Sequence, residues 1–225
     1  MQRTCDTVLR ISPSKAEIVV EQEKKGVISR KLITPETLAK CFLSSRYDTE
    51  THATGLLPEG CISVVITPKH TAYYIRCPEL YADICYYGTV YSNFPLPRLV
   101  FELRYMPAEG KIAKCRLCVV KDERLTMDTP TYRYPFSNVG FDGSICVGNN
   151  ALPRYKDPAR LGTLPGHILR MPNNNDHFSK DNNALKLEYR DLLEQMKGKE
   201  PSHYYTDLLI PDGKTLGSFI KGGTA

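Results

Sequence analysis

Alternating apolar and polar positions predict strands over much of the first half of the chain. Residues 8–33 contain short β-branched runs around a charged turn, and residues 61–77 contain two runs joined at residues 68–70. The clearest alternation covers residues 98–120, on both sides of residues 107–111, which carry the proline and glycine of a tight turn. These segments predict antiparallel hairpins.

Residues 34–46 have the pattern of a helix. Thr34 is a candidate N-cap, proline follows at the first helical position, and a glutamate in the first turn complements the helix dipole. Leu38, Cys41 and Phe42 fall on one face at helical spacing, so we expect Cys41 to lie in the core as a small apolar side chain.

A second helical pattern covers residues 183–197. Its apolar face consists of Leu185, Tyr189, Leu192, Leu193 and Met196, and a glycine follows as a stop signal. Residues 121–180, between the strands and this helix, are rich in turn-forming residues and have little periodicity. So long a loop in a compact domain is commonly functional.

Strands, one early helix, a hairpin, a long loop and a second helix predict an α+β fold on an antiparallel sheet. We expect three parts in the chain. Residues 1–58 form a β-rich elaboration with one helix, residues 59–200 form the main domain, and residues 201–225 form a polar tail that frays at its end.

Composition narrows the classes of function. The 225 residues are 41% hydrophobic and 24% charged, as in globular proteins, and the net charge of +5 is scattered along the sequence. That scatter argues against nucleic-acid binding. There is no apolar run long enough for a membrane span and no signal-peptide pattern, so we expect a cytoplasmic protein whose eight cysteines are reduced thiols.

Cys115 and Cys118 form a CxxC pair within a predicted strand. Because strand side chains alternate between faces, the two sulfurs should point in opposite directions. The two sulfurs of a metal or redox pair point to the same place, so we interpret these as two unrelated strand cysteines. The five histidines show no metal-ligand spacing, and the chain has no phosphate-binding or dinucleotide motif. We therefore expect no metal and no small-molecule cofactor.

Cys146 ends a loop rich in glycine and asparagine, residues 135–150. A nucleophilic thiol needs access, thiolate character and donors for the oxyanion that forms on the attacked carbonyl. The loop's glycines allow access, and the amide of Asn138 and N–H groups around Gly148 are candidate donors. From the residues alone, Cys146 is either a nucleophile or a buried bystander.

Residues 137–149, SNVGFDGSICVGN, resemble the active-site segment of ubiquitin-conjugating enzymes. Asn138 precedes Cys146 by eight positions, which is the separation in that family, and residues 142–146 match its Asp-Gly-Ser-Ile-Cys form. The upstream hairpin and downstream helix also follow the family's order. By this resemblance, Asp142 and Gly143 support the loop.

Two residues depart from the family's His-Pro-Asn motif, since Phe136 and Ser137 stand in place of histidine and proline. In the family the histidine holds the loop, so we expect burial of the Phe136 ring, helped by Tyr134 or Phe141, to do so here. In lacking the histidine and in its length, the chain resembles bacterial members of the superfamily. The group it resembles most is PRTRC system protein B, which is encoded in plasmid cassettes.

The resemblance implies a ubiquitin-conjugating-enzyme-like sheet with flanking helices and the N-terminal elaboration. It implies that Cys146 accepts a ubiquitin-like modifier as a thioester from an adenylating activating enzyme, with Asn138 as oxyanion donor and no cofactor. Asp176 and His177 are candidates for handling the proton of the incoming amine. Two alternatives remain: a non-catalytic adaptor on the same fold, and a redox sensor that uses Cys146 and a second thiol.

Overall fold

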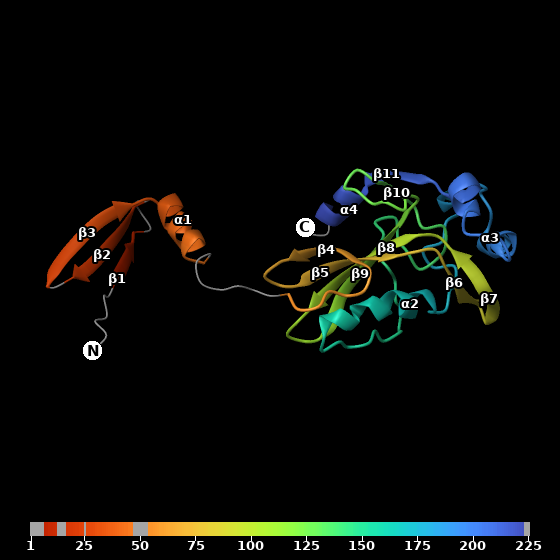
Figure 1. Ribbon diagram of the computed structural model, residues 1–225, viewed down its shortest axis with the longest axis horizontal. Coiled ribbons are helices and arrows are strands. Elements are labelled where there is room, and N and C mark those ends of the chain that lie inside the picture. Colours follow the sequence, from red (N-terminus) through yellow and green to blue (C-terminus); the bar gives the residue numbers. More distant parts are fainter. Residues whose placement is uncertain (1–6, 13–16, 25, 47–53, 223–225) are drawn as a thin grey trace. The chain divides into compact units, whose positions relative to one another are not determined.

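The computed structural model describes residues 7–12, 17–24, 26–46 and 54–222 (Figure 1). Cys5 and His52 lie outside these residues. The chain divides into two compact units, residues 1–54 and residues 55–225, and each is described by itself.

The first unit contains a three-stranded antiparallel sheet of β1 (Thr7–Ile11), β2 (Ile18–Lys24) and β3 (Val27–Ile33), followed by α1 (Pro35–Arg46). The Thr34 hydroxyl accepts a hydrogen bond from the N–H of Thr37 at 3.2 Å, which confirms the predicted cap. The expectation for Cys41 is wrong, because its side chain is exposed. Ile18 is the one buried side chain among the described residues of this unit. The apolar face of α1 that contains Cys41 therefore has almost no hydrophobic core to pack against.

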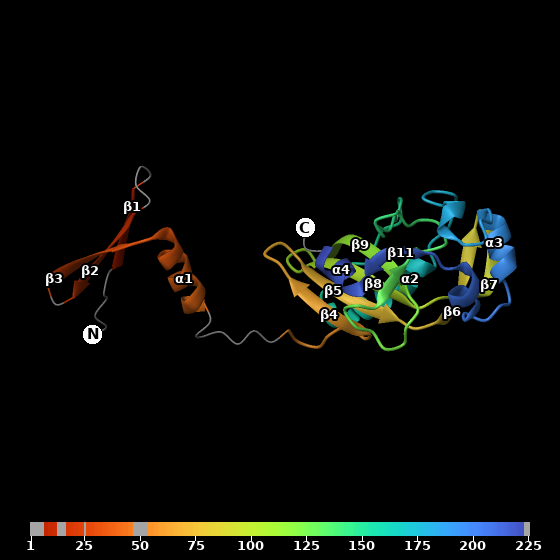
Figure 2. The same ribbon diagram turned by 90° about the horizontal axis from the view of Figure 1, so that it is seen from above.

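The second unit is built on a six-stranded antiparallel sheet with the order β11-β10-β9-β8-β5-β4. Its strands are β4 (Cys61–Ile66), β5 (Thr71–Cys77), β8 (Leu99–Met106), β9 (Lys111–Val120), β10 (Pro130–Tyr132) and β11 (Pro211–Thr215). Pairing of β4 with β5 and of β8 with β9, together with that of β2 with β3 in the first unit, confirms the three predicted hairpins, and the mixed elements confirm the α+β class. A further hairpin, β6 (Leu80–Tyr86) and β7 (Thr89–Leu96), stands at one end beside α3 (Tyr189–Met196) (Figure 2).

The sheet buries both of its faces. The larger core includes α2 (Leu164–Leu169), α3 and the β6–β7 hairpin, whereas α4 (Leu216–Gly222) covers part of the opposite face (Figure 1). Cys115 belongs to the first core and Cys118 to the second, as the alternation of strand side chains predicts. Short helical turns, η1 (Pro158–Thr163), η2 (Lys180–Asn182) and η3 (Tyr204–Leu208), connect these elements.

The C-terminal third differs from the sequence expectations in two places. Helix α3 begins at Tyr189 rather than near residue 183, because the amide of Asn183 exchanges two hydrogen bonds with the backbone of Leu187 and so holds a turn. Leu185 is consequently exposed, whereas Leu192 is fully buried. Where the sequence suggested a polar tail, the chain forms η3, β11 and α4.

No helix in the described part of the chain has both the length and the apolar character needed to cross a bilayer.

Candidate active site

The loop that carries Cys146 is a small closed hairpin. Val139 and Ile145 form an antiparallel bridge, and the N–H of Cys146 donates to the carbonyl of Asn138 at 2.8 Å. Inside it, the N–H of Gly140 donates to the carbonyl of Ser144 at 2.9 Å. The eight-residue spacing between Asn138 and Cys146 is therefore the spacing that makes them neighbours across a hairpin.

One side of this hairpin is fixed to β9 by main-chain hydrogen bonds. The N–H of Leu117 donates to the carbonyl of Gly143 at 2.9 Å, and the N–H of Ile145 donates to the carbonyl of Cys115 at 3.0 Å. Gly143 has a φ of +80°, and a Cβ added there would lie 2.6 Å from the carbonyl oxygen of Leu117. Only glycine fits so close an approach to the strand in this conformation.

The other side of the hairpin is fixed to the segment 172–177. Asn138 donates from its N–H to the carbonyl of Asp176 at 2.9 Å and from its side-chain amide to the carbonyl of Pro172 at 3.0 Å. Its φ of +63° is in the left-handed region, which asparagine tolerates better than most residues. The ring of His177 lies beside the same hairpin, because its Nδ1 is 4.0 Å from the point where a Cβ added at Gly140 would stand.

Asp176 and His177 thus border the hairpin that ends at Cys146. Both residues are exposed, and the Asp176 carboxylate accepts a hydrogen bond from the amide of Asn174 at 2.9 Å. The hairpin is hydrogen-bonded to the main chain of Asp176, and the ring of His177 lies beside Gly140.

Phe136 is buried directly behind the hairpin. It is 2% exposed, and its ring centroid lies 5.4–6.2 Å from those of four aromatic residues, Phe94, Tyr134, Tyr189 and Tyr204. The edge-on packing against three of these rings, Phe94, Tyr134 and Tyr204, adds to the stabilisation from apolar burial. Tyr134 contributes as expected, but Phe141 does not, because its ring is 73% exposed and lies 5.5 Å from the Arg133 guanidinium.

Asp142 shapes the turn of the hairpin. Its carboxylate accepts from the N–H of Ser144 at 2.9 Å and from the Ser144 hydroxyl at 2.5 Å. Partial burial alone would raise the pKa of this carboxyl, but the Ser144 hydrogen bonds, followed by the charges of Lys114 and Arg116, outweigh it. The pKa of Asp142 therefore lies below its ordinary value.

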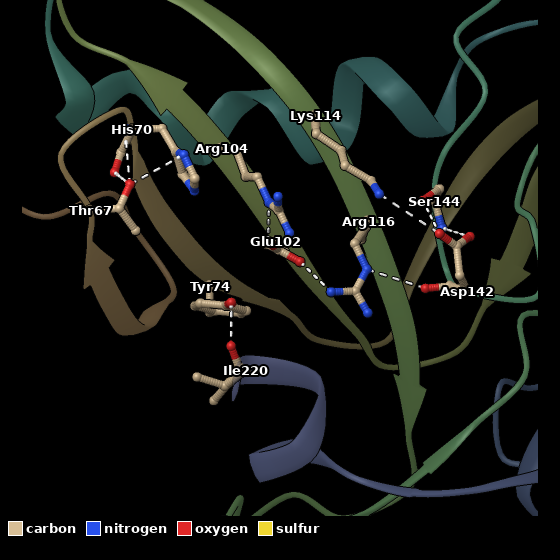
Figure 3. A network of polar contacts seen from close by, with 10 residues as sticks. All are labelled: Thr67, His70, Tyr74, Glu102, Arg104, Lys114, Arg116, Asp142, Ser144 and Ile220. Carbon is tan, nitrogen blue, oxygen red and sulfur yellow. Dashed lines mark hydrogen bonds and ion pairs between the residues drawn. The ribbon is translucent and has the colours of Figure 1, made fainter. Parts of the chain in front are cut away.

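A buried ion-pair network lies on β8 and β9 next to this turn, as Figure 3 shows. Glu102 is fully buried and accepts from the Nε of Arg104 at 2.7 Å and from the Nη1 of Arg116 at 2.8 Å. The Nε of Arg116 donates to the carbonyl of Asp142 at 3.2 Å, and its guanidinium carbon lies 4.6 Å from the ring centroid of Phe219 in α4. The sequence analysis does not predict this network. The glutamate within the apolar run of β8 is a signal that could have indicated a buried carboxylate with a basic partner.

The thiol of Cys146 is exposed and borders a pocket of about 20 Å³ together with Asn138 and residues of α2. That volume holds about one water molecule, so a substrate must approach over the surface. Burial raises the pKa of Cys77 and Cys115 to about 12, which makes their thiolates scarce at neutral pH. Among the described residues, no group of three or more His, Cys, Asp or Glu side chains is placed to hold a metal ion.

Comparison with known proteins adds an independent observation. Residues 42–209, about three quarters of the chain, match the model of prokaryotic E2 family D, E2 being the abbreviation for ubiquitin-conjugating enzymes. No curated protein and no solved structure matches the chain. On the strength of the family match, this chain belongs to prokaryotic E2 family D, a bacterial family of E2-like proteins.

Proposed function

We propose that this protein transfers a ubiquitin-like modifier through a thioester on Cys146. The Cys146 thiolate attacks the thioester carbonyl carbon of a charged activating enzyme, a new C–S bond forms, and the enzyme's thiolate leaves. An acceptor amine then attacks the Cys146 thioester, forms an amide, loses its proton to a base and releases the thiol. The observation that carries the proposal is an exposed cysteine hydrogen-bonded to Asn138 across a hairpin that main-chain bonds fix on two sides.

In this proposal Asn138 donates to the oxyanion of the tetrahedral intermediate. Its amide has two N–H groups, of which one is needed for the carbonyl of Pro172. The same side chain can therefore hold the segment 172–177 and present its second N–H toward the reacting carbonyl. A preorganised donor of this kind contributes about a hundredfold or more to the rate.

We assign the proton of the incoming amine to Asp176 or His177. The support is their position on the segment that is hydrogen-bonded to Asn138 and lies beside Gly140. Each offers a side-chain base on an exposed loop, where an amine can approach together with its solvent. The modifier and the activating enzyme are the partners of this reaction, and ATP is used by the enzyme that adenylates the modifier.

The two alternatives make different demands on the thiol. An adaptor needs no covalent adduct on Cys146. A redox sensor needs a resolving thiol, and Cys115, whose backbone contacts Ile145, is buried with its pKa raised to about 12. That burial disfavours it as a resolving partner.

The resemblance to PRTRC system protein B makes a separate prediction. If the chain belongs to that group, a gene for an adenylating protein should lie beside the gene for this chain.

Chemical loading of the thiol tests the reaction without the natural modifier. We expect wild-type protein incubated with a fluorescent acyl thioester to form an adduct on Cys146 that hydroxylamine releases. Cys146→Ala should abolish this adduct, and Cys146→Ser should form at most a slower, more stable oxyester. Cys118→Ser, at a buried thiol, and Cys41→Ser, at a second exposed thiol, are the controls and should load like wild type. A labile adduct that persists in Cys146→Ala would refute the assignment, and wild-type protein that never loads would favour the adaptor.

Variants of the neighbouring residues separate loading from transfer. Asn138→Gly keeps the left-handed backbone available but removes the amide, so we expect both steps to slow by about a hundredfold. Alanine at Asp176 or His177 should slow transfer to an amine more than loading. Equal effects on the two steps would contradict a role in proton handling.

A further inference from the structure

A concave basic surface follows the active-site hairpin in the chain. We call it the basic groove, and its charged residues are Arg154, Lys156, Asp157, Arg160 and Arg170. The extended residues 153–157 line one side, and η1 and α2 line the other. The volume of the groove, about 860 Å³, lies within the range of sites that enclose a drug-sized ligand.

The four cations of the basic groove are exposed and form no ion pair within the part of the chain that the structure describes. Arg154 donates to the carbonyl of Glu109 at 3.5 Å, which leaves its charge uncompensated. Seven cations elsewhere in the same unit have acidic partners, namely Arg98, Arg104, Lys111, Lys114, Arg116, Lys180 and Lys186, whereas single cations such as Lys69, Arg124 and Lys199 also lack one among the described residues. The groove is thus a local concentration of positive charge that the protein itself does not neutralise.

The single acid of the groove has a structural use. The carboxylate of Asp157 accepts from the N–H of Ala159 at 3.0 Å and so caps η1. The wall that carries Arg154 and Lys156 is fixed as well. The N–H of Tyr155 between them donates to the carbonyl of Gly110 at 2.7 Å, and its own carbonyl accepts from the Tyr105 hydroxyl at 2.9 Å. The cations therefore project from a preformed surface, which lowers the entropic cost of binding.

The basic groove lies close to the reactive thiol. One side of α2 contributes Ile168 and Leu169 to the small pocket at Cys146, whereas His167 of α2 and Arg170, which caps the end of the helix, line the groove. A helix with its side chains is about 10–12 Å wide. A chain segment in the groove would therefore have residues within reach of the thioester.

We infer that the basic groove binds an acidic segment of the acceptor protein and so brings a neighbouring lysine to the Cys146 thioester. This inference rests on the proposed function and names its class of substrate. Charge complementarity selects an acidic ligand. The lining favours protein over nucleic acid. The Tyr155 ring is buried, which leaves His167 as the one exposed ring of the groove, whereas surfaces that bind single strands stack successive bases on several aromatic side chains.

Binding is tested first, without thioester chemistry. The probe is a fluorescent peptide with one lysine flanked by glutamates, compared with the same peptide carrying glutamines. We expect the full chain to bind the acidic peptide at least about tenfold more tightly at low salt, and the preference to shrink as added salt screens the charges. Equal binding of the two peptides would overturn the inference. So would tighter binding of a single-stranded oligonucleotide or of anionic vesicles.

Charge reversal locates the site. The variant Lys156→Glu, Arg160→Glu, Arg170→Glu should lose the preference for the acidic peptide. A matched control with the same change of net charge, Lys69→Glu, Arg124→Glu, Lys199→Glu, alters three exposed cations outside the groove and should keep it. Loss of the preference in both variants would show a general charge effect and overturn the assignment.

Substitution at Gly166 gives a test that does not disturb the cations. This residue lines the groove from α2, and an added Cβ would meet no atom within 4 Å, so a larger side chain is tolerated. Gly166→Glu should place a carboxylate in the groove and weaken binding of the acidic peptide, whereas Gly166→Ala should not. Unchanged binding in Gly166→Glu would contradict occupancy of the groove.

Transfer then links the groove to the thiol. Wild-type protein loaded with the fluorescent acyl group should acylate the lysine of the acidic peptide at least about tenfold faster than that of the neutral peptide. The triple charge-reversal variant should load normally but lose this preference. Failure to load would count against the proposed thioester function alone, since binding is measured separately. Normal loading with equal transfer to both peptides would overturn the inference and leave the proposed function standing.

Discussion

Replacement of Glu102 by alanine tests the ion-pair network beneath the active-site turn. The carboxylate is fully buried and bonded to two guanidinium groups, whose side chains are only 15% and 11% exposed. Its removal leaves two poorly hydrated positive charges with no acid between them. Breaking a buried pair in this way costs about 3–5 kcal/mol in the free energy of unfolding. For a unit of this size, that loss lowers the melting temperature by about 6–20 °C.

Two further variants separate charge from hydrogen bonding. Glu102→Gln keeps one acceptor oxygen but removes the charge, so we expect a smaller loss of about 1.5–3 kcal/mol. The control is Glu188→Ala, which removes the partner of Lys180 from a pair whose side chains are 68% and 57% exposed. An exposed pair of this kind contributes at most about 1 kcal/mol.

The assay is urea unfolding followed by circular dichroism, with each free energy taken from the midpoint and the slope. Unchanged slopes across the variants would show that the difference lies in the folded state. If Glu102→Ala lost less than about 1 kcal/mol, similar to Glu188→Ala, the network would not be the buried, mutually compensating arrangement described above.

Two other predictions follow from burial and from charge. Leu192 is fully buried in α3, so Leu192→Ala should lose about 2–5 kcal/mol, whereas Leu185→Ala, at a 43% exposed position, should lose less than about 0.5 kcal/mol in the same unfolding assay. Similar losses would contradict the observed start of α3. The pKa of Asp142 is lowered in the folded protein, so near that pKa the unfolded state binds more protons than the folded state. The stability that this carboxylate contributes is therefore fully present above its ordinary pKa of 3.8 and is lost as the pH falls through the lowered value. Asp142→Asn should therefore melt below wild type at pH 6, and the gap should close as the pH falls through and below that value. A gap that stays constant down to pH ~3 would contradict the lowered pKa.

Local pattern predicted the parts of the fold whose partners are near in sequence. The hairpins of β4–β5 and β8–β9 follow from alternation on both sides of a turn, and the cap at Thr34 follows from a single side chain. The pairing of Asn138 with Cys146 was also within reach, because eight residues that contain glycines close a small hairpin.

Features that depend on contacts between residues far apart in the sequence could not be predicted from local pattern. The short run of β11 forms a strand only because β10 offers it an edge, and α1 has an apolar stripe but little core to cover. The start of α3 is set by the side chain of Asn183, which competes with the helix for the backbone of Leu187. The cations of the basic groove look scattered in sequence and converge only when η1 and α2 turn back toward residues 153–157.

The position of α4 has a consequence for synthesis of the chain. Residues 216–222 cover the face of the sheet that carries Tyr74 and Val100, and the Tyr74 hydroxyl donates to the carbonyl of Ile220 at 2.8 Å. A ribosome adding 5–20 residues per second makes β8 roughly 5–20 s before α4. During that interval the face that α4 will cover is apolar and open, so chaperones can bind it until α4 has been made.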